Sequence, residues 1–137
     1  MELILILPIL VAFFVCFFVL GKWIIKAKKM GLVWEDMNKP GKPKNVAGSG
    51  GLIVIMAFLL AVLAYIAIKT FYLKQEENIV EIFALTTSIL ILGGIGIIDD
   101  LLGWHHGGLS KKFRLLLCIF AAIPLMVINV GNSQISF

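Results

Sequence analysis

The amino-acid sequence predicts an all-α fold, a polytopic bundle of four transmembrane helices with both chain termini outside. Two observations predict it. Of the 137 residues, 61% are hydrophobic and only 15% are charged, far less charge than a soluble domain carries. The apolar residues also lie in long continuous runs, which excludes an ordinary amphipathic core. We therefore expect an integral membrane protein, and the net charge of +4 does not imply nucleic acid as a partner.

Each expected span is a run close to the length of about 20 apolar residues that a membrane-crossing helix needs. The four runs cover residues 3–25, 51–68, 82–98 and 115–130 of one membrane domain, 1–137. The first is no cleavable signal peptide, because Glu2 makes its start acidic and no small-residue cleavage site follows. Gly93, Gly94 and Gly96 predict close approach of a neighbouring helix to the third span. Pro124 predicts a kink in the fourth.

The positive charges predict the orientation. Ten of the twelve Lys and Arg residues lie in or beside two loops, residues 26–50 and 99–114. The other two, Lys69 and Lys74, share their connection with three glutamates. Because cytoplasmic loops carry an excess of Lys and Arg, both long loops are expected at the cytoplasmic face, where nucleotides are available.

Asp99 and Asp100 are the candidate catalytic and metal-binding residues. They are expected where the third span leaves the membrane, and the helix macrodipole disfavours negative charge at such an end. A divalent cation or nearby Lys and Arg would remove that penalty, so we expect Mg²⁺, with Mn²⁺ as a second option. The simpler alternative is a solvated helix end. His105 and His106 are weaker candidates for acid–base or metal chemistry.

Arg114 and Lys112 are the candidates for binding a phosphate at the membrane surface. A guanidinium binds phosphate oxygens through a fork of donors, and Arg114 lies at the expected boundary of the fourth span. Lys112 can equally be part of the positive flank that orients this span. In the first loop, Gly48 to Gly51 directly precede the second span, and glycine-rich backbone at a helix start receives anions. The alternative for this loop is a flexible basic connector on anionic lipid.

Three stretches carry a resemblance to a known family. They are Asp36–Lys39, Gly96–Asp100 and Phe113–Leu117, with Asn129–Asn132 as a fourth, weaker match. Together they resemble the polyprenyl-phosphate N-acetylhexosamine-1-phosphate transferases. The nearest branch is the eukaryotic and archaeal UDP-GlcNAc:dolichyl-phosphate GlcNAc-1-phosphate transferases.

The resemblance implies a reaction. GlcNAc-1-phosphate, or a related HexNAc-1-phosphate, passes from a UDP-N-acetylhexosamine to a polyprenyl or dolichyl phosphate, and UMP is released with the help of magnesium. This is the first step in building a lipid-linked oligosaccharide or a cell-envelope glycan. The resemblance also admits a homodimer.

The resemblance further implies residue roles. Nucleotide-sugar binding falls to four consecutive residues, Glu35, Asp36, Met37 and Asn38. Arg114 stands where the family usually has a lysine at the lipid phosphate, and Asp99 and Asp100 organise that phosphate or the metal. The chain departs from the family near Gly48, where some members carry an acidic nucleotide contact. Family members are also longer, so we expect an N-terminal portion that is inactive alone.

The sequence leaves two other hypotheses open. One is a small four-span transporter that uses Asp99 and Asp100 as a cation site, and the other is an assembly subunit. A transporter needs a polar path, and the third span offers only three hydroxyl residues for it, Thr86, Thr87 and Ser88.

Overall fold

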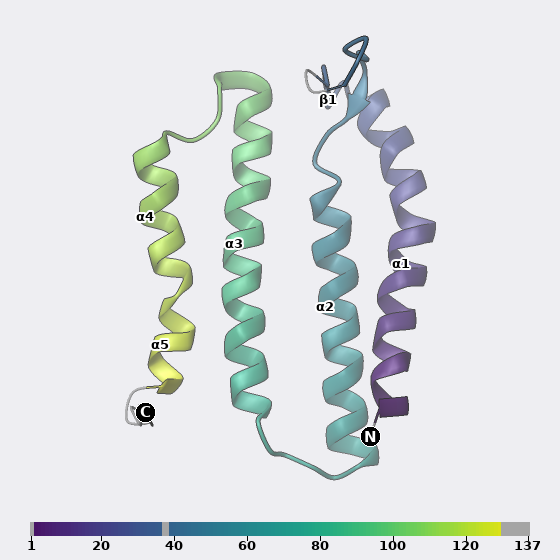
Figure 1. Ribbon diagram of the computed structural model, residues 1–137, viewed down its shortest axis with the longest axis vertical. Coiled ribbons are helices and arrows are strands. Elements are labelled where there is room, and N and C mark those ends of the chain that lie inside the picture. The colour runs from purple at the N-terminus through teal and green to yellow at the C-terminus, as the bar shows by residue number, and fades with distance from the viewer. Residues whose placement is uncertain (1, 37–38, 130–137) are drawn as a thin grey trace.

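The computed structural model describes residues 2–36 and 39–129, and helices make up most of them (Figure 1). The helices are α1 (Glu2–Lys29), α2 (Gly51–Ala67), a π-helical turn η1 (Ile68–Tyr72), α3 (Ile79–His106), α4 (Lys111–Ala121) and α5 (Ile123–Asn129). Three stretches are long and apolar enough to cross a membrane, Ile6–Lys29, Gly51–Tyr72 and Ile79–Gly103. The predicted all-α membrane architecture is confirmed for these three spans.

The fourth expected span is not one continuous helix. Residues 111–129 form α4 and α5, of 11 and 7 residues, each shorter than a bilayer-crossing helix needs to be. The chain breaks at Ala122, two residues before Pro124, whose ring cannot sit against the preceding turn of a regular helix. The predicted kink is therefore confirmed. A fourth span, and both termini outside, stay predictions.

The helices stand side by side in the order α1, α2, α3 and then α4 with α5 (Figure 1). Small residues line the contacts between them, as is usual for helices in lipid, and Ala57, Ala61 and Ala84 are all buried. The predicted close approach is confirmed at Gly93, where a Cβ would lie 2.4 Å from Ile55 Cδ1 of α2. At Gly94 and Gly96, a Cβ would meet no described atom within 4 Å.

Helix α3 ends later than the sequence predicted. The expected boundary at residue 98 was wrong, because the helix continues through Asp99 and Asp100 to His106. It stops at Gly107, whose φ of 81° is a left-handed conformation that glycine adopts without strain. The aspartates therefore lie on the side of a helix, and the connection to α4 shortens from the expected loop 99–114 to residues 107–110.

The first polar loop contains a small antiparallel hairpin that the sequence did not predict. Strand β1 (Val33–Trp34) pairs with β2 (Val46–Ala47), with Val33 opposite Ala47. The hairpin and the α3–α4 connection lie at the same end of the helices (Figure 1). The prediction that the two basic loops lie together is confirmed, and their cytoplasmic side stays a prediction.

Candidate active site at the hairpin end of the helices

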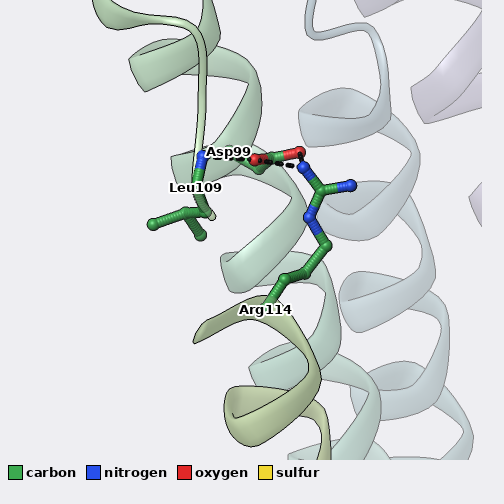
Figure 2. A network of polar contacts seen from close by, with 3 residues as sticks. All are labelled: Asp99, Leu109 and Arg114. Carbon is green, nitrogen blue, oxygen red and sulfur yellow. Dashed lines mark hydrogen bonds and ion pairs between the residues drawn. The ribbon is translucent and has the colours of Figure 1, made fainter. Parts of the chain in front are cut away.

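The site centres on the Asp99 carboxylate, which joins three elements (Figure 2). Its Oδ1 accepts a hydrogen bond of 2.8 Å from the backbone N–H of Leu109, in the turn after α3. Arg114, in the first turn of α4, brings Nη2 to 2.8 Å from Oδ1 and 2.7 Å from Oδ2. One of the two candidate catalytic carboxylates is thus paired with the candidate phosphate-binding cation.

The turn between α3 and α4 has the backbone that this pairing needs. Gly107 and Gly108 both have φ near +80°, where other residues are strained. A Cβ on Gly108 would lie 3.0 Å from Asp99 Oδ1, so a side chain there would press against the carboxylate. Ser110 then caps α4, because its hydroxyl accepts a hydrogen bond of 3.3 Å from the N–H of Phe113.

Asp100 has a different environment from Asp99. It is exposed, and among the side chains that the structure describes it has no ion pair or hydrogen bond. Lys112 is also exposed, in the first turn of α4. The sequence did not distinguish the two carboxylates, and in the structure Asp99 is engaged whereas Asp100 is open. His105 and His106 fall in the last turn of α3, and their side chains lie outside the described part.

Trp34 connects the hairpin to the aspartate site. A Cβ on Gly48 would lie 2.5 Å from Trp34 Nε1, and a Cβ on Gly103 would lie 3.3 Å from the far edge of the same indole. Gly103 follows Asp99 by four residues, so the two lie on the same face of α3. The indole, which extends from β1, thus lies between Gly48 and the helix face that carries Asp99, and this positions the hairpin against the site.

The predicted nucleotide-sugar residues follow directly after Trp34. Glu35 is exposed, and the Asp36 carboxylate pairs with Lys39 at 3.4 Å across the tip of the hairpin. The N–H of Asp36 donates to the carbonyl of Pro43 at 3.1 Å, which holds the two arms of the loop together. Met37 and Asn38 lie outside the described residues. Their role in binding stays a prediction, as does that of Glu35 and Asp36.

Sequence reasoning missed Trp34, Gly108 and the N–H of Leu109 as parts of the site. Two successive glycines after a charged helix face are a signal for a helix end with left-handed backbone, and they could have indicated the turn. Nothing in the sequence pairs Trp34 with Gly103, because the two are distant along the chain and belong to different elements.

Fold and site together define a helical membrane protein with an Asp–Arg ion pair at one end and a basic hairpin packed beside it. Sequence similarity to known proteins indicates which kind of membrane protein this is. The chain is 32% identical over 131 residues, 95% of its length, to a protein of Saccharolobus solfataricus provisionally named UDP-N-acetylglucosamine–dolichyl-phosphate N-acetylglucosaminephosphotransferase. A relative of the same provisional name in Sulfolobus acidocaldarius is 32% identical over 124 residues, 90% of the chain.

A third relative, from Dictyostelium discoideum, carries the same enzyme name and is 29% identical over 108 residues, 76% of the chain. The chain spans 37%, 35% and 25% of the lengths of these three proteins. No family model and no solved structure matches it. The resemblance inferred from the motifs is confirmed, since the similarity covers nearly the whole chain and ties it to transferases named for UDP-GlcNAc and dolichyl phosphate.

Proposed function

We propose that this chain forms the phosphate-handling part of a UDP-N-acetylhexosamine:polyprenyl-phosphate N-acetylhexosamine-1-phosphate transferase. An oxygen of the lipid phosphate attacks the β-phosphorus of the UDP-sugar, the bond from that phosphorus to the bridging oxygen breaks, and UMP leaves with the electron pair. The observation that carries the proposal is the Asp99–Arg114 pair at the end of a membrane span, beside the hairpin. UDP-GlcNAc and dolichyl phosphate are the substrates that the relatives' names support.

The described residues suit this chemistry, because phosphoryl transfer depends mainly on positioning and on neutralising charge. Arg114 is 48% exposed at the start of α4 and offers donors to a phosphate held at the membrane surface. Lys112 adds a second positive charge in the same turn. The hairpin supplies Glu35 and Asp36 to the nucleotide-sugar side, and Trp34 holds it against α3.

Asp100 is the residue that we propose for the metal. Among the described residues, no group of three or more His, Cys, Asp or Glu side chains gathers into a metal cage. Mg²⁺ is commonly bound by one or two carboxylates together with substrate phosphates and water, so a single open carboxylate fits it, and Mn²⁺ also takes oxygen ligands. The bound ion would neutralise phosphate charge. Asp99, the other predicted ligand, has both oxygens engaged by Leu109 and Arg114.

A transport role finds less support. The Thr86 hydroxyl donates to the Ile82 carbonyl at 2.6 Å, and the Thr87 hydroxyl donates to the Phe83 carbonyl at 2.7 Å. Both therefore bond to their own helix. In the described part of α3, Ser88 is then the only hydroxyl without such a bond, which is too little to line a path for a cation.

The test is release of UMP from UDP-GlcNAc by the complete transferase of which we propose the chain to form part, in lipid nanodiscs that contain a polyprenyl phosphate. We expect wild-type turnover that needs a divalent cation. Asp100→Asn is expected to lower kcat by a factor on the order of 100 or more, the size typical of removing one electrostatic group from a reacting site. Glu81→Gln, a matched loss of one carboxylate at the opposite end of α3, should leave turnover unchanged. Full activity of Asp100→Asn would contradict the proposed site.

A further inference from the structure

The two neighbouring aspartates differ in what is left for a ligand. The described partners of Asp99 occupy both of its oxygens, at distances of 2.7 to 2.8 Å, and its side chain is only 21% exposed. A substrate phosphate would be repelled by this carboxylate and would find no free edge on it. Asp100, one residue further along α3, is exposed.

Arg114 is held by only part of its guanidinium. In the contacts that the structure describes, Nη2 alone reaches Asp99, and it approaches both oxygens. The other terminal nitrogen points away from the carboxylate (Figure 2). A guanidinium carries five N–H donors in a rigid plane, so this end-on pairing leaves most of the fork available to a phosphate. The ion pair orients the guanidinium and leaves most of its N–H donors free of Asp99.

Asp99 also fixes the helix from which Arg114 extends. The hydrogen bond from Leu109 N–H ties the turn 107–110 to α3, and the turn leads directly into the first turn of α4. The N–H of Arg114 donates to the Ser110 carbonyl at 2.9 Å, so the backbone of Arg114 follows that turn. One carboxylate therefore sets both the guanidinium and the backbone that carries it.

We infer that Asp99 is a positioning residue that orients Arg114 toward the lipid phosphate, while Asp100 is the carboxylate of the pair that is open to ligands. The inference rests on the proposed function and divides its two aspartates into separate roles. A long, flexible arginine loses conformational freedom when it binds a phosphate. Holding it in place beforehand lowers that cost, so the contribution of Asp99 belongs to the binding of the lipid substrate.

The test separates KM from kcat in the same nanodisc assay, with the polyprenyl phosphate and UDP-GlcNAc varied in turn. Asp99→Asn is the informative variant, because its amide oxygen still accepts from Leu109 while the charge that holds Arg114 is lost. We expect the KM for the lipid phosphate to rise about 10-fold or more, the scale seen when a residue that orients a ligand-binding side chain is removed. The KM for UDP-GlcNAc should not change.

A double-mutant cycle adds a readout that a purely structural role would not produce. In an Arg114→Gln background, Asp99→Asn should add no further rise in the KM for the lipid phosphate, because the residue through which it acts is gone. Additive effects would overturn the inference. A lower KM would also overturn it, since Asp99 would then compete with the phosphate for Arg114. A loss of kcat with both KM values unchanged would instead place Asp99 at the reacting atoms.

The outcomes distinguish a wrong division of roles between the two aspartates from a wrong proposed function. An active wild type with any of these contrary results overturns the division of roles and leaves the transferase proposal standing. A complete transferase with the wild-type chain that releases no UMP in the presence of both substrates and Mg²⁺ overturns the transferase proposal, and the inference with it.

Discussion

Replacing Gly48 with alanine tests whether Trp34 holds the hairpin against α3. The added Cβ would lie 2.5 Å from Trp34 Nε1 and 2.6 Å from Cδ1. Comfortable contacts between such atoms are about 3.5–4.0 Å, so the indole has to move by roughly 1 Å or more. Its far edge packs at Gly103, and the side chain is 42% exposed, so the only easy direction is away from the helix.

The same geometry gives an estimate of the unfolding free energy that Gly48→Ala loses. Overpacking a fitted contact typically costs about 1–3 kcal/mol, and the exposure of Trp34 puts Gly48→Ala at the lower end, near about 1 kcal/mol. Gly51→Ala is the matched control, because a Cβ there meets nothing within 4 Å of the described atoms. The measurement is the free energy of unfolding in a mixed-micelle denaturant titration of the two variants and the wild type.

Repeating the measurement in a Trp34→Ala background tests the contact between Gly48 and the indole directly. With Trp34→Ala in place, the added methyl group of Gly48→Ala has no indole to displace, and its cost should fall to the level of Gly51→Ala. An unchanged cost in that background would refute the assigned contact, because the strain would then lie elsewhere. So would a Gly48→Ala protein that is as stable as the Gly51→Ala control.

Three further predictions concern α3 and its turn. Gly107→Ala and Gly108→Ala should each lose about 1–2 kcal/mol for left-handed backbone, and Gly108→Ala should lose more because its Cβ also meets the α3 carboxylate at 3.0 Å. Unfolding free energies of the pair measure the difference, and equal losses would contradict the close contact. Gly93→Ala should destabilise α2–α3 packing, and Ile55→Val, which removes the atom 2.4 Å from the new Cβ, should recover part of the loss in thermal unfolding. Ser110→Ala should cost about 1 kcal/mol and speed amide hydrogen exchange at the start of α4, and unchanged exchange would show that the cap is dispensable.

Hydropathy predicted the spans well because the membrane imposes one dominant requirement on them. Long apolar runs have to become helices in lipid, and three of the four predicted runs form helices long and apolar enough to cross a membrane. The position of the α3 end was wrong because hydropathy reports where the membrane stops, and a helix can continue into water. The apolar run ends before Asp99, whereas the helix ends at Gly107.

The charged residues of the candidate site could be predicted from the sequence, but the contacts that join its elements could not. Asp99 and Arg114 stand out as ions beside apolar runs, but the sequence did not show that they pair, because the connection between α3 and α4 was expected to be the longer loop 99–114. The hairpin was missed because strands of two residues carry no periodicity to detect. The contact between Trp34 and Gly103 depends on how α1 and α3 are arranged in space, which local patterns do not encode.

The break at Ala122 is a point around which α4 can tilt relative to α5. Arg114 lies eight residues before the break, which is about 12 Å along a helix that rises 1.5 Å per residue. A tilt of α4 by about 10° around this point would carry the base of Arg114 through about 2 Å, more than an ion pair of 2.7 Å can absorb. Whether Asp99 and Arg114 are in contact therefore depends on the angle of α4. A small change in packing around Pro124, two residues beyond the break, would then make or break one ion pair at the other end of α4.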